Sequence, residues 1–277
     1  MSTRPKYMIR SDMEGASGVV SYDQVLPERP DYPIGQRLFR ADLGSCIAGL
    51  RDGGAGEIVI YDEHCDGRNI DADWLPEDVS FIAGKPPYRA DWAGGLDASF
   101  AGLVMLGFHS KWGTPRGLLH HTYEHDICEL RINGVAVGEI GMETAIAGDF
   151  GVPLQLLTAD SAGCQEAQTL VPGVRTVAVK ESVSETGGQC YPLSQTTAWI
   201  REAAAAIVTD PPDSKPWRCG AVSLEVSFNP GPFADALRQG NSNDLNTDGD
   251  LLLEGPSATA VWADYWQRKL AAFAQVS

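Results

Sequence analysis

Short runs of apolar residues, several of them rich in valine and isoleucine, alternate along this chain with longer segments of helical pattern. The runs are apolar at nearly every position, which is typical of strands buried on both faces of a parallel sheet. Six strands are predicted, at Tyr7–Ser11, Ile58–Tyr61, Ser80–Ala83, Leu103–Phe108, Leu154–Thr158 and Thr176–Lys180. This alternation predicts an α/β fold, a mostly parallel sheet flanked by helices.

The segments between these strands carry the signals of helices and of one hairpin. Helices are predicted at Ile34–Asp52, 139–150, Ala162–Leu170 and 193–208. Ser161 precedes the third helix and is expected to cap it, because a serine oxygen accepts a hydrogen bond from the first helical turn. Residues 128–137 are expected to form a hairpin that turns at Asn133–Gly134, since both residues tolerate the positive φ of a type I′ turn.

A change in composition at residues 209–214, which are rich in proline and aspartate, indicates a linker or long loop. Beyond it, Ala221–Phe228 alternates like a half-buried strand, and a helix is predicted at 258–276. We therefore expect a main α/β domain over residues 1–210 that carries the chemistry. A smaller C-terminal α+β part over residues 211–277 is expected to pack on the main domain rather than fold independently.

Polar side chains follow three of the predicted strands at the point where each strand ends. Asp12 follows the first strand, His64 lies just past the second, and His109 follows the fourth directly. Ligands of open parallel sheets bind outside the carboxyl ends of the strands, so these side chains are expected to meet at one edge. Glu14 would share a face with Asp12 in an extended backbone, and Glu139 would point into the same crevice from a helix start.

Each of these residues alone has an ordinary explanation, so the prediction depends on their convergence. Asp12 would cap a turn, and Glu139 would complement a helix dipole. Glu14 and His64 would be polar loop residues, and His109 would be a buried, hydrogen-bonded histidine. The functional hypothesis is that all five approach one another.

Two imidazoles and three carboxylates suit two zinc-like ions that share a bridging group, whereas structural zinc sites prefer four cysteine or histidine ligands. Two ions about 3.5–4 Å apart would polarise a carbonyl group and activate a water molecule for hydrolysis. One alternative is a single Fe(II) held by two histidines and one carboxylate, as in oxygenases. Another is a metal-binding protein without catalytic activity.

His121 is the candidate catalytic residue. It lies in a loop downstream of His109, and all five histidines of the chain fall between residues 64 and 125. An imidazole that is not bound to metal would carry a proton to a leaving amine or attack the carbonyl carbon itself. The sequence leaves both roles open, together with that of a loop histidine without function.

The formal net charge of −16 disfavours nucleic acids and anionic membranes as partners. The chain has no run of about 18 apolar residues, and its first residues lack the apolar stretch of a signal peptide. The six cysteines are scattered and form no C-x-x-C pair, which disfavours a disulfide framework. We expect a cytoplasmic protein that binds a small molecule or a short peptide.

Five blocks of this sequence together resemble the DppA-like zinc D-aminopeptidase family. They are residues 11–18 (SDMEGASG), 62–64 (DEH), 106–109 (LGFH), 114–121 (TPRGLLHH) and 132–141 (INGVAVGEIG). The resemblance implies two zinc ions, bound at the positions that match Asp12, Glu14, His64, His109 and Glu139. It also implies that Asp12 bridges the ions and that His121 is the catalytic residue.

The same resemblance implies an aminopeptidase that removes N-terminal D-residues from short peptides. It further implies a homo-oligomer, a ring-shaped decamer with an internal chamber. The sequence departs from the family pattern at residues 123–126 (YEHD) and by one extra residue around Arg116. Because these departures flank the catalytic loop, they bear on substrate choice, and an amidase acting on a different small amide is the alternative.

Overall fold

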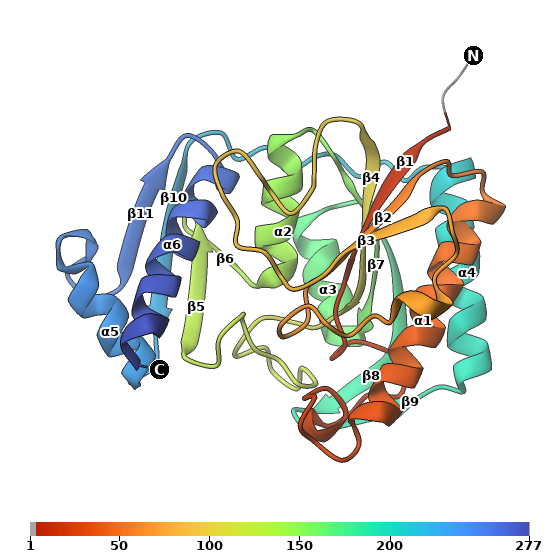
Figure 1. Cartoon of the computed structure of the whole chain (residues 1–277), viewed down its shortest axis with the longest axis horizontal. Helices are drawn as coiled ribbons and strands as arrows, with labels where there is room; N and C mark the ends of the chain where they lie inside the picture. Colours follow the sequence, from red (N-terminus) through yellow and green to blue (C-terminus); the bar gives the residue numbers. More distant parts are fainter. Residues whose placement is uncertain (1–3, 277) are drawn as a thin grey trace.

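The computed structural model describes residues 4–276 and confirms an α/β protein built on a mostly parallel sheet (Figure 1). The sheet contains β1 (Lys6–Ser11), β2 (Ile58–Asp62), β3 (Val79–Ile82), β4 (Phe100–Phe108), β7 (Leu154–Asp160), β8 (Arg175–Ser184) and β9 (Gly187–Cys190). Their order is β3-β2-β1-β4-β7-β8-β9, and every neighbouring pair is parallel except β8–β9. Chain order reverses between β1 and β4, so a topological switch point lies there.

Helices cover both faces of this sheet. α1 (Tyr32–Asp52) and α4 (Leu193–Thr209) pack together on one face, and α2 (Glu139–Asp149) and α3 (Ser161–Leu170) lie on the other. Successive strand residues therefore enter opposite cores: Tyr7 and Ile9 pack in the core beneath α1, whereas Met8 packs in the core on the other face. Among residues 4–276, no helix is both long and apolar enough to span a bilayer.

A second, antiparallel sheet lies beside α2, at the left of Figure 1. It contains β5 (Ile127–Ile132), β6 (Val135–Val137), β10 (Val222–Phe228) and β11 (Leu251–Gly255), in the order β11-β10-β5-β6. The helices α5 (Pro232–Gly240) and α6 (Ala258–Val276) complete the C-terminal part. Because β10 pairs with β5 and α6 packs on α2, we propose that residues 211–277 fold together with residues 1–210.

The structure differs from the sequence predictions at several elements. The pattern did not reveal β9, α5, β11 or the short 3-10 helices at Tyr22–Gln24, Ala72–Trp74 and Ser242–Asp244. The predicted cap of α3 was wrong: Asp160 caps this helix by accepting from Gly163 N at 2.7 Å, and Ser161 is the first helical residue. A carboxylate at the N-cap also interacts favourably with the helix dipole. The hairpin turn is confirmed, with φ of 50° at Asn133 and 80° at Gly134.

Close backbone contact joins the loop that follows β1 to the last residues of β4. Asp12 N donates to Leu106 O at 2.8 Å, and Gly15 N donates to Gly107 O at 2.7 Å. Gly107 has a φ of 74°, and the register of β4 against β7 shifts between Leu106 and Phe108. A Cβ at position 15 would lie 1.8 Å from Phe108 O. Glycine is therefore required at position 15 for this loop to touch the end of β4.

We predict that Gly15→Ala destabilises the fold by about 3 kcal/mol, because the added methyl group forces the loop after β1 away from the end of β4. Urea unfolding measures this loss. The matched control is Gly44→Ala in α1, where the added Cβ would lie an ordinary 3.9 Å from the Trp74 ring. The control is expected to gain about 0.5–1 kcal/mol from helix propensity. Equal unfolding midpoints for Gly15→Ala and the wild type would show that the close approach is not needed.

Candidate metal centre

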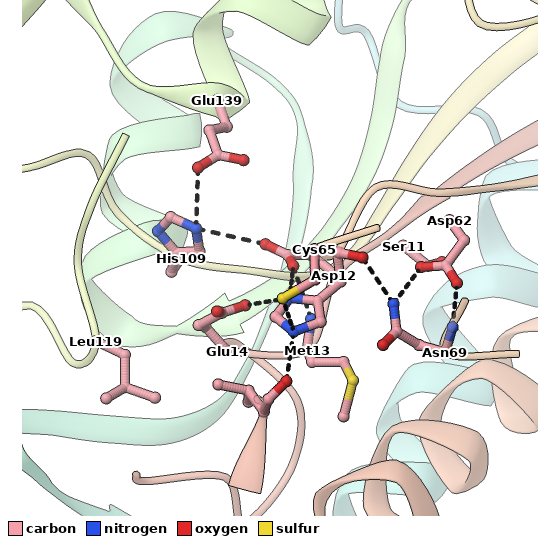
Figure 2. Close-up of polar contacts among 12 residues, drawn as sticks. Ser11, Asp12, Met13, Glu14, Asp62, Cys65, Asn69, His109, Leu119 and Glu139 are labelled. Atoms are coloured by element: carbon pink, nitrogen blue, oxygen red, sulfur yellow. Dashed lines mark hydrogen bonds and ion pairs between the residues drawn. The ribbon is translucent and has the colours of Figure 1, made fainter. Parts of the chain in front are cut away.

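The residues proposed as metal ligands meet at the carboxyl edge of the parallel sheet, at its switch point. Asp12 follows β1, His64 follows β2, His109 follows β4 and Glu139 begins α2; these four and Glu14 are all buried. Figure 2 shows Glu139, His109 and Asp12 in a row, with Glu14 beside them. The structure thus brings together all five side chains that the sequence pattern singled out.

The Asp12 carboxylate lies between the two imidazoles and offers one oxygen to each. His64 Nδ1 is 2.9 Å from Asp12 Oδ1 and 3.0 Å from Glu14 Oε2. His109 Nε2 is 3.4 Å from Asp12 Oδ2 and 3.3 Å from Glu139 Oε1. The cluster therefore divides into two halves, each with one histidine and one glutamate, and Asp12 is shared between them.

The outward ring nitrogen of each of these histidines is held by a main-chain carbonyl. His64 Nε2 lies 2.7 Å from Val25 O, and His109 Nδ1 lies 3.0 Å from Ser110 O. In a neutral imidazole, an N–H that donates to a carbonyl fixes the tautomer and leaves a lone pair on the other nitrogen, where a metal ion would take the place of a proton. In both rings that other nitrogen faces the carboxylates.

The loop carrying His64 is braced from behind. The side chain of Asn69 donates to Asp62 Oδ1 at 2.9 Å and to His64 O at 2.8 Å, as Figure 2 shows for the Asp62 contact. Asn69 N also donates to Asp62 Oδ2 at 2.7 Å. The last residue of β2 thus sets the path of the chain through His64.

The donor atoms fit metal ions. Among the described residues, His109 Nε2 and Glu14 Oε2 are buried polar atoms without a hydrogen-bond partner, and both point into the cluster. Ligand atoms of Asp12, Glu14 and His109 lie within 4.8 Å of one another, and so do those of His109, His121 and Glu139. Buried carboxylates this close together are costly unless a cation balances their charge.

The pKa directions show the same demand for positive charge. Burial, followed by the charge of Glu14, raises the pKa of Asp12 to about 7. Burial would also raise the pKa of Glu139, but His109 outweighs it and lowers the pKa to about 2. The pKa of His109 in turn rises to about 10, since Glu139 outweighs the effect of burial. The carboxylates keep their charge only where an imidazolium or another cation stands beside them.

His121 lies against the cluster, beside His109 and nearly parallel to it. Its ring stacks on His109, with centroids 3.9 Å apart, and its Nε2 is 3.7 Å from Glu139 Oε1. Its Nδ1 lies 3.0 Å from Leu119 O, which leaves the Nε2 lone pair on the side of Glu139. Burial, followed by the charge of His109, lowers the pKa of His121 to about 4. The imidazole is therefore neutral at neutral pH and able to accept a proton.

The cluster opens into a cavity of about 620 Å³, a size suited to a small ligand. Tyr123, Glu124 and His125, which depart from the family pattern, line this cavity. The ring of His125 stacks on that of His121, with centroids 5.3 Å apart. These three residues therefore lie where a substrate would contact the protein.

Sequence reasoning missed the role of Lys180, which it treated only as the end of a strand. The side chain is fully buried, and its Nζ donates to Glu14 O at 2.6 Å, Ala16 O at 2.9 Å and Val19 O at 2.5 Å. A lysine within a buried strand needs such partners, and this was the available signal. Lys180 fixes the loop that carries Glu14.

Imidazoles and carboxylates gathered at the switch point of an α/β sheet suit a hydrolytic metal site better than a structural one. A family model described as D-aminopeptidase (Peptidase_M55) matches residues 6–259. The chain therefore belongs to the D-aminopeptidase family. This confirms the resemblance and favours an aminopeptidase over the amidase and non-catalytic alternatives.

Two relatives agree with this assignment. The D-aminopeptidase of Bacillus subtilis strain 168 is 29% identical over 213 residues, which cover 76% of each chain. A solved structure, described as the Zn-dependent D-aminopeptidase DppA from Bacillus subtilis, a self-compartmentalizing protease, superposes with a TM-score of 0.90 at 24% identity. This match covers 97% of the present chain and 98% of the other, and shows that the two share one fold.

We predict that Lys180→Met lowers the free energy of unfolding by about 2–4 kcal/mol, because buried carbonyl oxygens lose their donor. Hydrogen exchange of residues 14–19 is expected to quicken, while exchange in α4 stays unchanged in conditions where the variant is folded. Lys215→Met, at an exposed lysine remote from the cluster, controls for the lost charge. If both variants unfold at the wild-type urea concentration, Lys180 does not hold the loop.

Proposed function

We propose that this protein is a D-aminopeptidase-like metallohydrolase that cleaves the first amide bond of short peptides or amino-acid amides at a dinuclear zinc centre. The observation that best supports this proposal is the position of Asp12. Each of its two carboxylate oxygens faces the inward ring nitrogen of a different histidine, His64 or His109. The description of DppA as Zn-dependent supports zinc as the metal. An oxygenase site needs two histidines and a single carboxylate, whereas three carboxylates converge here.

The geometry suggests how the ligands divide. Glu14 and His64 would hold one zinc ion, and His109 and Glu139 the other, with Asp12 bridging them. Bound zinc supplies a Lewis acid for the scissile carbonyl and lowers the pKa of water to near neutrality. Zinc binding is compatible with the tautomers described above, because the carbonyls of Val25 and Ser110 already occupy the outward nitrogens.

His121 would carry the proton during hydrolysis. Its neutral Nε2 would take a proton from the attacking water and deliver it to the nitrogen of the leaving amine. The Leu119 carbonyl holds the other nitrogen, so the ring keeps one orientation through both transfers. The stacked His109 ring limits rotation of His121 further. This arrangement supports the proton-carrier role rather than direct attack on the carbonyl.

We further propose that the chains assemble into a homo-oligomer, with the decamer of the resembled family as the expected form. The description of DppA as self-compartmentalizing supports this proposal. Exposed apolar side chains such as Val183 on β8 and Leu270 on α6 are available for subunit contacts. A cytoplasmic location remains a prediction of the sequence.

We predict that the protein purified without chelators contains about two zinc ions per chain, as measured by inductively coupled plasma mass spectrometry. His109→Ala is expected to lose most of this zinc, since the variant leaves Glu139 and Asp12 without an imidazole between them. Removal of zinc with a chelator should lower the unfolding temperature of the wild type and spare that of the variant. Iron at one ion per chain, or full zinc in His109→Ala, would refute the proposed centre.

We predict that His121→Ala keeps its zinc but loses about 10²–10⁴-fold in kcat, because the variant lacks the imidazole whose Nε2 faces Glu139 and is proposed to carry the proton. The assay is hydrolysis of D-alanine p-nitroanilide, with the L isomer alongside. His120→Ala is the control, since that neighbouring ring faces Glu185 and accepts from Gly113 N. Wild-type turnover by His121→Ala would remove it from the mechanism, and a preference for the L isomer would contradict the proposed stereochemistry.

A further inference from the structure

Most charged groups that line the active-site cavity already have a partner. Glu63 pairs with the buried Arg10, which also lies 2.7 Å from Glu143 Oε2. Glu124 pairs with Lys269, whose ammonium lies 4.2 Å from the centroid of the Trp266 ring. Asp12, Glu14 and Glu139 are the carboxylates proposed to bind zinc. The zinc ions would therefore balance the negative charge of these three carboxylates in the metal-bound enzyme.

Lys85 is the exception among the cations of this cavity. Its side chain lines the cavity together with Asp12, His121 and Glu139. Within residues 4–276, no carboxylate oxygen lies within 4.0 Å of its ammonium group, and no atom accepts a hydrogen bond from it. The carboxylates of Glu63, Glu139 and Glu124 act on this ammonium group only from beyond ion-pair distance. An ammonium group in a partly enclosed cavity that forms no ion pair is suited to bind an anionic group of a ligand.

The backbone of Lys85 is held in an uncommon conformation. Its φ is 42°, in the left-handed region, although a proline follows it and disfavours helical angles at this position. Hydrogen bonds hold the chain on both sides: Gly84 N donates to Gly67 O at 2.7 Å, and Tyr61 OH donates to Pro86 O at 3.2 Å. Such conformations cost about 1–3 kcal/mol and persist where the surroundings impose them, often at functional sites.

We propose that Lys85 binds the C-terminal carboxylate of a short peptide substrate and thereby selects peptides with a free C-terminus close to the scissile bond. This inference rests on the proposed aminopeptidase function. Positive charge at the scissile carbonyl comes from the proposed zinc ions. In a short peptide without charged side chains, the C-terminal carboxylate is the one negatively charged group. This carboxylate needs a cation beside it once it enters the cavity. Lys85 can supply this cation, because it lines the cavity and forms no ion pair with any of residues 4–276.

The test compares two substrates that differ only in this charge, D-alanyl-glycine and D-alanyl-glycinamide. Lys85→Met is expected to raise KM for D-alanyl-glycine by about 10- to 100-fold, the effect of one charge-assisted hydrogen bond. Its kcat on that substrate, its kinetics on the amide and its zinc content should stay at wild-type values. Lys85→Arg should keep most of the preference for D-alanyl-glycine over D-alanyl-glycinamide. Lys215→Met, which removes a remote exposed lysine, should have wild-type kinetics on both substrates.

Each other result has a definite meaning. Equal losses on both substrates would place Lys85 at the reacting carbonyl and overturn its role as a carboxylate-binding residue. Unchanged kinetics on both substrates would also overturn it. If the wild-type enzyme hydrolyses neither substrate while it contains zinc, the proposed aminopeptidase function itself fails. Activity of Lys85→Met on the amide shows that the variant is folded.

Discussion

Three carboxylates and two imidazoles share a small volume at the edge of the parallel sheet, where all five side chains are buried, and much of the structure serves to hold them there. Like charges at this spacing repel strongly in a low-dielectric interior, so the cluster depends on positive charge between its members. Asp12 lies at its centre, with His64 on one side and His109 on the other. The carbonyl of Val25, from a distant loop, orients the His64 ring, the adjacent Ser110 carbonyl orients the His109 ring, and Lys180 anchors the loop after Asp12.

The C-terminal part is joined to this site by more than simple packing. The antiparallel sheet contains β6, which leads directly into α2 and so sets the position of Glu139. From the opposite end of the chain, α6 places Trp266 and Lys269 on the wall of the cavity. The main sheet therefore positions Asp12, His64 and His109, whereas Glu139 and the walls of the cavity depend on both sheets together.

The success of the sequence predictions follows the strength of each local signal. The parallel strands were recognisable because burial on both faces makes them apolar throughout, and the main helices because each spans several turns. By contrast, β9 contains two adjacent glycines, and β11 is only five residues long. Both are strands because they pair with β8 and β10, a long-range contact that no local pattern contains. Asp160, rather than Ser161, caps α3. The strand β7 extends to Asp160, two residues beyond the predicted strand end at Thr158, and α3 begins directly after it.

The sequence by itself determined which chemistry-bearing residues follow strand ends, and hence that Asp12, His64 and His109 would meet at one edge. Parallel strands leave little choice, because their carboxyl ends lie side by side. Only the tertiary structure decided how Asp12 is shared between His64 and His109 and which ring nitrogen of each histidine faces the cluster. It also decided that Lys85 lines the cavity without forming an ion pair with any of residues 4–276. These properties depend on carbonyls and charges supplied by segments far apart in the chain, whose distances no local pattern encodes.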